Sequence, residues 1–197
     1  MSGAPAAFID RDGVINALVA DPWTGHHESP LHVRQVALIP GATDAMRRLS
    51  AAGLLLVGVS NQPAAAKGAV SREELEAVNA RVLELVAFDG GRFDAFRICM
   101  HHPEGVVGGL TMACECRKPA PGMLLDAARE LEIDLGRSWM IGDTDGDVRA
   151  GAAAGCRAIL VEHPASAHKR STKTQPDAKV ASLAAAAVLI LGPDRIH

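Results

Sequence analysis

The chain has 197 residues, of which 48% are hydrophobic and 22% charged, and its formal net charge is −3. These values exclude a disordered chain and predict a soluble globular protein of one domain, residues 1–197, with no overall positive field for binding nucleic acid. The longest apolar run, residues 184–191, is far shorter than the roughly 20 residues that a membrane span needs, so we expect no contact with a membrane.

Short apolar runs alternate with segments of helical periodicity along the whole chain. We expect strands at residues 6–9, 54–59, 94–99, 138–141 and 156–161, and helices at 43–52, 71–88, from 122 onward, at 147–154 and at 180–191. Ser71 and Glu74 form a capping box at the start of the second helix. Residues 163–179 are rich in Lys, Ser, Thr and Pro and predict a flexible connection. The alternation predicts an α/β fold around a mainly parallel sheet.

Polar side chains follow three of the predicted strands at the point where each strand ends. They are Asp10 and Asp12, then Ser60 and Asn61, and finally Asp143. In open α/β sheets the ligand binds outside the carboxyl ends of the strands, so we expect these groups to meet at one edge. A single Asp-Gly pair is usually a turn or a helix cap. Three carboxylates in a small space repel one another unless a cation lies between them, and oxygen ligands with room for water suit Mg²⁺.

Four motifs in this order resemble the motifs of the haloacid dehalogenase superfamily of phosphatases. Residues 8–16 (Phe-Ile-Asp-Arg-Asp-Gly-Val-Ile-Asn) resemble the first motif of the superfamily, and Ser60-Asn61 resembles the second. Lys118 within Arg117-Lys118-Pro119 is similar to the third motif, and residues 142–147 (Gly-Asp-Thr-Asp-Gly-Asp) are similar to the fourth. The resemblance implies a three-layer α/β/α Rossmann-like sandwich with no large cap domain, because no insertion between the motifs is long enough for one.

The resemblance also implies a role for each of these residues. Asp10 would attack phosphorus and form an aspartyl-phosphate, while Asp12 would protonate the leaving oxygen and later accept a proton from water. Mg²⁺ would be held by Asp10, Asp143 and the carbonyl group of Asp12. The expected ligands of the phosphoryl oxygens are Ser60, Asn61 and Lys118. We expect Asp147 to brace the site rather than to bind the metal directly.

A second metal site is predicted from cysteine and histidine spacing. Cys99, His101, Cys114 and Cys116 follow the pattern C-x-H-x12-C-x-C, in which four ligands arrive in two pairs. Four protein ligands are typical of a closed structural Zn²⁺ site, so we expect a zinc-binding loop at residues 99–116. The simpler alternative is a set of scattered core cysteines, which is how we interpret Cys156.

The combination of this loop with Cys-x-Cys-Arg-Lys-Pro is similar to one branch of the superfamily. That branch comprises the D-glycero-D-manno-heptose 1,7-bisphosphate 7-phosphatases, with the histidinol-phosphate phosphatases as relatives. The resemblance implies a small phosphorylated sugar as substrate, with Arg117 on its second phosphate or its hydroxyls. Two alternatives stay open: a histidinol-phosphate phosphatase, and a binding module that keeps the zinc but has lost catalysis.

Some features depart from the family pattern. The loop at residues 17–39 is longer than usual and places His26, His27 and Glu28 on the expected substrate side, and Thr144 stands where some heptose enzymes have Lys. The sequence assigns no role to either feature, although adjacent loop histidines are more often solvated or substrate-facing than metal-bound. The N-terminus lacks a secretory signal, so we expect a cytosolic protein. We also expect a monomer.

Overall fold

A six-stranded parallel sheet forms the centre of the computed structural model, which describes residues 3–21, 25–171 and 173–192. The strand order is β5-β4-β1-β6-β7-β8, and every neighbouring pair is parallel. The strands of this sheet are β1 (Ala6–Ile9), β4 (Leu55–Asn61), β5 (Ala95–Cys99), β6 (Trp139–Gly142), β7 (Arg157–Val161) and β8 (Ala178–Val180). The remaining two strands, β2 (Val19–Ala20) and β3 (His27–Glu28), form a small antiparallel hairpin in the loop after β1.

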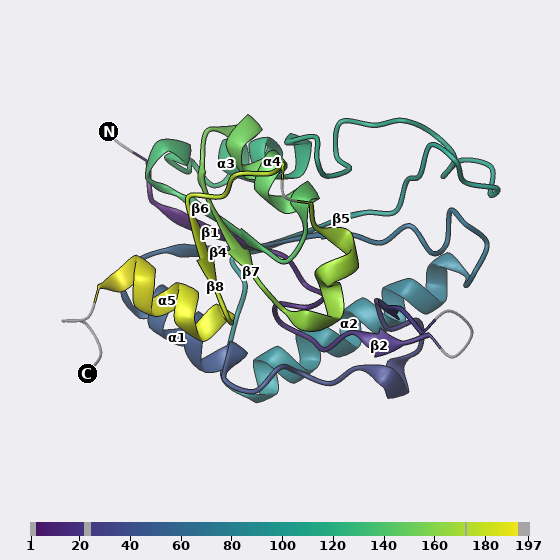
Figure 1. Ribbon diagram of the computed structural model, residues 1–197, viewed down its shortest axis with the longest axis horizontal. Coiled ribbons are helices and arrows are strands. Elements are labelled where there is room, and N and C mark those ends of the chain that lie inside the picture. The colour runs from purple at the N-terminus through teal and green to yellow at the C-terminus, as the bar shows by residue number, and fades with distance from the viewer. Residues whose placement is uncertain (1–2, 22–24, 172, 193–197) are drawn as a thin grey trace.

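Helices cover both faces of the sheet, as the alternation of apolar runs and helices predicts (Figure 1). The α-helices are α1 (Ala42–Ala51), α2 (Arg72–Phe88), α3 (Gly122–Glu130), α4 (Asp145–Ala154) and α5 (Leu183–Leu191), and the short 3₁₀-helices are η1 (Val33–Gln35), η2 (Leu135–Arg137) and η3 (Pro164–Lys169). The predicted capping box begins α2, where the Glu74 backbone N–H donates to the Ser71 hydroxyl and the Ser71 N–H donates to the Glu74 carboxylate.

The two faces of the sheet bury separate apolar clusters. Ala7 and Ile9 of β1 belong to the cluster with α1, α2 and α5, whereas Ala6 and Phe8 belong to the cluster with α3 and α4. Successive strand residues point to opposite faces, so a fully apolar strand contributes to both layers. The predicted three-layer α/β/α arrangement with a mainly parallel sheet is confirmed.

One predicted segment is organised differently. Residues 163–179, expected to form a flexible connection, contain η3 and the first two residues of the edge strand β8, and α5 begins at Leu183 rather than at Val180. The predicted start of the helix at Val180 was wrong, and β8 was not predicted because it has only three residues and lies among polar ones. Its pairing with β7 defines it as a strand, and a tertiary contact of this kind leaves no periodic pattern in the sequence.

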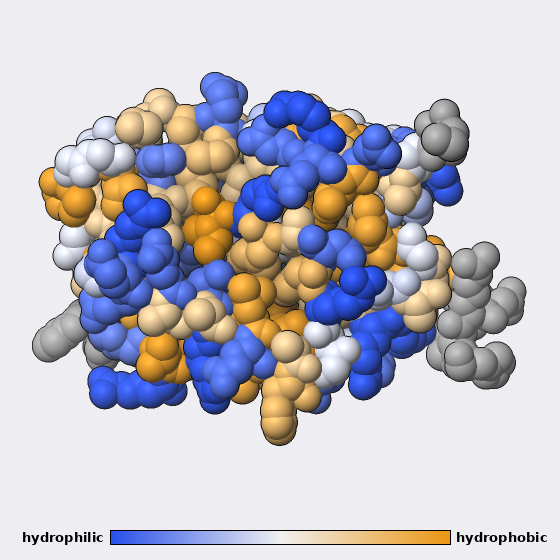
Figure 2. Space-filling model, turned by 180° about the vertical axis from the view of Figure 1, so that it is seen from behind, coloured by the Kyte–Doolittle hydropathy of each residue, from blue (hydrophilic) through white to orange (hydrophobic). Residues whose placement is uncertain are grey.

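The loops at the carboxyl ends of the strands extend toward one side of the molecule, on the right in Figure 1. The start of β1 and the end of α5 lie on the other side, on the left in the same view. On the face that Figure 2 shows, hydrophilic and hydrophobic residues are interspersed. Among the described residues, no helix is both long and apolar enough to cross a membrane.

Candidate active site

Three buried carboxylates lie together at the carboxyl ends of the two central strands. Asp10 directly follows β1, Asp143 directly follows β6, and Asp147 lies in the first turn of α4. One oxygen of each lies within 4.8 Å of an oxygen of the other two. The structure therefore brings the predicted Asp10 and Asp143 together, because β1 and β6 are hydrogen-bonded neighbours that end at the same edge.

Two glycines make this close approach possible. Gly13 has a φ of +80°, and a Cβ there would lie 2.2 Å from an Oδ atom of Asp143. A Cβ on Gly142 would lie 2.2 Å from the Cβ of Asp147. Real atoms cannot approach so closely, so both positions exclude any side chain.

The Lys118 ammonium group bridges two members of this cluster. Its Nζ lies 2.8 Å from Asp10 Oδ1 and 2.6 Å from Asp147 Oδ1, and it donates a third hydrogen bond of 2.7 Å to the carbonyl oxygen of Val59. The Asn61 amide fixes the Lys118 backbone: its Nδ2 donates to the Lys118 carbonyl at 2.9 Å, and its Oδ1 accepts from the Lys118 N–H at 3.1 Å. Asn61 thus holds in place the lysine that contacts the cluster.

One ammonium does not neutralise three buried carboxylates. Burial raises the pKa of Asp10 well above its ordinary value; Lys118 opposes this, while the Asp147 and Asp143 carboxylates raise it further. Burial and the Asp147 carboxylate raise the pKa of Asp143 to about 7. A divalent cation would supply the missing positive charge, and carboxylate oxygens are the ligands that Mg²⁺ prefers. The donor set therefore fits Mg²⁺.

The Asp12 carboxylate lies outside this group of three and has its own partners. It accepts hydrogen bonds from the Arg11 guanidinium at 3.0–3.1 Å, from Asn16 Nδ2 at 2.8 Å and from Gln62 Nε2 at 2.5 Å. Although burial opposes the effect, the Arg11 charge and these hydrogen bonds lower the pKa of Asp12. Asp12 still lines the same cavity as Asp10.

Ser60 is placed differently from the other predicted phosphate ligands. It is buried, its Oγ accepts a hydrogen bond of 2.9 Å from Gln62 Nε2, and it does not line the cavity. Gln62 therefore connects Ser60 to Asp12. Sequence reasoning missed Gln62, and the only available signal was its place directly after the Ser60-Asn61 motif.

A cavity of about 520 Å³ opens above the carboxylates. Its lining includes four basic side chains besides Lys118, namely Lys67, Arg117, Arg149 and Lys169. Arg117 donates a 3.3 Å hydrogen bond to the His101 carbonyl, which attaches it to the cysteine-containing loop. An acidic floor below basic walls suits a phosphorylated small molecule that binds together with a cation.

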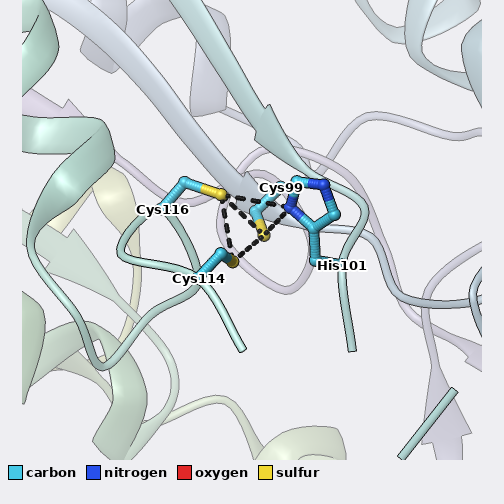
Figure 3. A group of neighbouring side chains, drawn as sticks. All are labelled: Cys99, His101, Cys114 and Cys116. Atoms are coloured by element: carbon cyan, nitrogen blue, oxygen red, sulfur yellow. Dashed lines mark hydrogen bonds between the residues drawn. The ribbon is translucent and has the colours of Figure 1, made fainter. Parts of the chain in front are cut away.

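The four predicted zinc ligands also meet (Figure 3). The Sγ atoms of Cys99, Cys114 and Cys116 lie 3.2–3.6 Å apart, and His101 Nδ1 lies 3.4 Å from Cys116 Sγ and 3.8 Å from Cys99 Sγ. In a tetrahedral zinc site with Zn–S bonds near 2.3 Å, neighbouring sulfur atoms are about 3.7 Å apart. The geometry could therefore hold zinc. Cys156 lies apart from this cluster, where burial raises the pKa of its thiol to about 12.

Comparison with known proteins agrees with this geometry. Residues 115–186 match the family model described as HAD-hydrolase-like. The chain is 41% identical to the D-glycero-beta-D-manno-heptose-1,7-bisphosphate 7-phosphatase of Rhodopseudomonas palustris over 151 residues, which cover 77% of this chain and 79% of that protein. It is 37% identical to the protein of the same name from Escherichia coli K12 over 150 residues, 76% of this chain and 74% of that one.

A solved structure is similar over almost the full length of both chains. The D,D-heptose 1,7-bisphosphate phosphatase of B. bronchiseptica, complexed with magnesium and phosphate, superimposes with a TM-score of 0.76 and 31% sequence identity, covering 94% of this chain and 98% of that one. The motifs, the sheet order and these similarities agree. The chain belongs to the haloacid dehalogenase superfamily of phosphatases.

Proposed function

We propose that the protein is a Mg²⁺-dependent phosphatase that removes the 7-phosphate of D-glycero-D-manno-heptose 1,7-bisphosphate in nucleotide-activated heptose biosynthesis. The observation that supports this most strongly is the meeting of Asp10, Asp143 and Lys118 in one cavity, in a chain 41% identical to a protein named for that reaction. The cytosolic location and the monomeric state stay predictions.

Two carboxylates would carry the chemistry. Asp10 attacks phosphorus in line, so that an O–P bond forms at Asp10 while the bond from phosphorus to the sugar oxygen breaks. Asp12 donates a proton to that leaving oxygen, and in the second step it accepts one from the water that hydrolyses the aspartyl-phosphate. The hydrogen bonds to Asp12 stabilise its ionised form, which is the form that the second step needs.

Mg²⁺ would be held by the carboxylates of Asp10 and Asp143 and by the Asp12 carbonyl, and it would supply positive charge that lets one anion approach another. Lys118 would bind a phosphoryl oxygen from the position it already holds beside Asp10. Asn61 would act by holding Lys118, Ser60 would act through Gln62, and Asp147 would brace Lys118.

The cysteine cluster would hold a structural Zn²⁺, because four protein ligands leave no open position for water or substrate. Cys116 directly precedes Arg117 and Lys118, so the metal would fix the two cations over the phosphate site. Arg117 would then bind the second phosphate of the substrate.

The test is a phosphate-release assay on the Asp10→Asn variant. We expect activity to fall more than about a thousandfold, because the amide cannot act as the nucleophile, while the thermal unfolding midpoint stays within a few degrees of the wild type. Asp126→Asn, on the exposed face of α3, is the matched control and should keep full activity. An Asp10→Asn enzyme within tenfold of the wild type would falsify the mechanism.

Parallel kinetics on both heptose bisphosphate anomers and on histidinol phosphate would test the substrate. A bisphosphate can use Arg117, whereas the imidazole amine of histidinol phosphate cannot, so kcat/KM should be higher for the bisphosphate. No phosphate release from any of them in the presence of Mg²⁺ would instead favour a binding module that has lost catalysis.

A further inference from the structure

The wall of the cavity contains an ion pair that the catalytic roles do not use. Glu28 of β3 and Lys169 at the end of η3 both line the cavity, and Lys169 Nζ lies 2.6 Å from Glu28 Oε2. The other carboxylate oxygen of Glu28 lies 3.6 Å from His168 Nε2. The Glu28 side chain is 54% exposed and that of Lys169 is 27% exposed, so the carboxylate remains accessible beside its partner.

The Lys169 side of this pair is attached to the catalytic end of the sheet. Arg170 Nη1 donates to the carbonyl oxygens of Val161 and His163, at 3.4 and 2.9 Å. The Ser171 backbone N–H and hydroxyl donate to Asp145 Oδ2 at 2.9 and 2.6 Å. These bonds fix η3 against the end of β7 and the start of α4, so Lys169 holds Glu28 at a defined place relative to Asp143.

Three basic residues of the cavity wall, Lys67, Arg117 and Lys169, differ in charge balance. Lys169 is neutralised by Glu28, whereas Arg117 and Lys67 pair with no carboxylate in the part of the chain that the structure describes. Arg117 and Lys67 both line the cavity. An unneutralised pair of cations suits a phosphate, while a neutral ion pair offers it no net attraction.

A carboxylate in a neutral pair suits a different part of the substrate. Each of its oxygens has lone pairs for hydrogen bonds, so it can accept from two neighbouring hydroxyl groups. A second phosphate placed there would instead face a carboxylate of the same charge sign. The two groups of residues therefore separate the recognition of phosphate from the recognition of hydroxyls.

We propose that Glu28, held by Lys169, is a specificity-determining residue that accepts hydrogen bonds from hydroxyl groups of the substrate's sugar. This rests on the proposed function, because it assigns a contact to the leaving group of that reaction. It also gives a role to the long loop at residues 17–39, of which residues 22–24 lie outside the described part of the chain.

The test is steady-state kinetics of the Glu28→Ala variant of the Mg²⁺-loaded full-length protein on two substrates. These are heptose 1,7-bisphosphate, whose leaving group carries hydroxyls, and p-nitrophenyl phosphate, whose leaving group carries none. We expect KM for the bisphosphate to rise about tenfold with kcat within about twofold, since hydrogen bonds to a charged group are lost. KM for p-nitrophenyl phosphate should not rise, because its leaving group has no hydroxyl to lose a hydrogen bond and Lys169 stays in the cavity.

Two further variants refine this experiment. Glu28→Gln keeps an oxygen acceptor without the charge, so its KM should lie between those of wild type and Glu28→Ala. Glu162→Ala is the matched control, because Glu162 forms a similar half-exposed ion pair with Lys179 at 3.2 Å but does not line the cavity. Lys169 is left unchanged because its ammonium lies near enough to Asp143 to lower the pKa of that carboxyl group.

The outcomes separate this inference from the proposed function. A wild-type protein that releases no phosphate from either substrate overturns both. A wild type active on heptose bisphosphate, with an unchanged KM in Glu28→Ala or an equal rise in KM for the two substrates, overturns only the role of Glu28. A rise in KM confined to the sugar substrate supports it.

Discussion

At the scale of single residues, charge balance explains why the site is built as it is. Three buried carboxylates share one buried ammonium, because Lys118 contacts Asp10, Asp147 and the Val59 carbonyl oxygen. The sequence could predict the meeting of Asp10 and Asp143, because residues at the ends of parallel strands share an edge. Lys118 lies in the loop between β5 and α3, and only the family resemblance implied its place at the site. It could not show that Gln62 binds Asp12, since that contact depends on side-chain packing between two loops.

We predict that Lys118→Met is inactive and also less stable. Methionine fills the space but leaves Asp10 and Asp147 buried without a cation, and breaking a buried ion pair typically costs about 3–5 kcal/mol of unfolding free energy. Denaturant unfolding in metal-free buffer measures this. Lys179→Met, which breaks a half-exposed pair with Glu162, should cost less than about 1 kcal/mol. Equal losses in the two variants would contradict the prediction.

At the scale of elements, the sequence predicted the ligands of the cysteine loop but did not predict the short elements η3 and β8. After Cys99, the last residue of β5, the loop to residue 116 contains no helix or strand, yet its ligand spacing identified all four members of the cluster. In η3 and β8 the opposite holds, because both are regular elements but too short and too polar to leave a periodic signal. The spacing of the metal ligands can be read within a short stretch of sequence. The strand β8, in contrast, forms only by pairing with β7 at the edge of the sheet.

We predict that removing zinc with a chelator lowers the melting temperature and weakens substrate binding together. The metal would hold Arg117 and Lys118 in place, and a ligand that binds only the folded state stabilises that state. Differential scanning calorimetry and KM, measured after metal analysis has verified the loss of zinc, provide the readout. The Cys114→Ser variant should respond less to the same treatment. An unchanged melting temperature in zinc-free protein would count against a structural metal.

At the scale of the whole molecule, the order of the strands determines where the activity can lie. β1 is at the centre, with β4 on one side and β6 on the other, and all three carry predicted site residues at the same end. The alternation of elements predicted this parallel arrangement. The position of β8 could not be predicted, because it is a short strand that pairs with β7, which is distant in sequence. The β2–β3 hairpin could not be predicted either, because its strands have two residues each and lie in an irregular loop.

We predict that Asp143 makes the metal-free protein less stable as the pH rises. The pKa of Asp143 is raised to about 7 in the folded state, so the folded protein binds a proton more tightly than the unfolded chain. This contribution is fully present below about pH 4 and is lost as the pH rises to about 7, and it is on the order of 4 kcal/mol.

The measurement is chemical denaturation of metal-free wild type and Asp143→Asn across this pH range. The wild-type free energy of unfolding should fall relative to that of the variant between about pH 4 and 7, and saturating Mg²⁺ should reduce the difference. A difference that is constant with pH would contradict the raised pKa of Asp143.

The positions of the two described chain ends have a practical consequence. The start of β1 and the end of α5 both lie on the side of the molecule away from the cavity loops (Figure 1). A tether attached at either end would therefore leave the mouth of the cavity facing the solution. The enzyme could be immobilised on a solid support, or fused to another protein, with substrate access preserved.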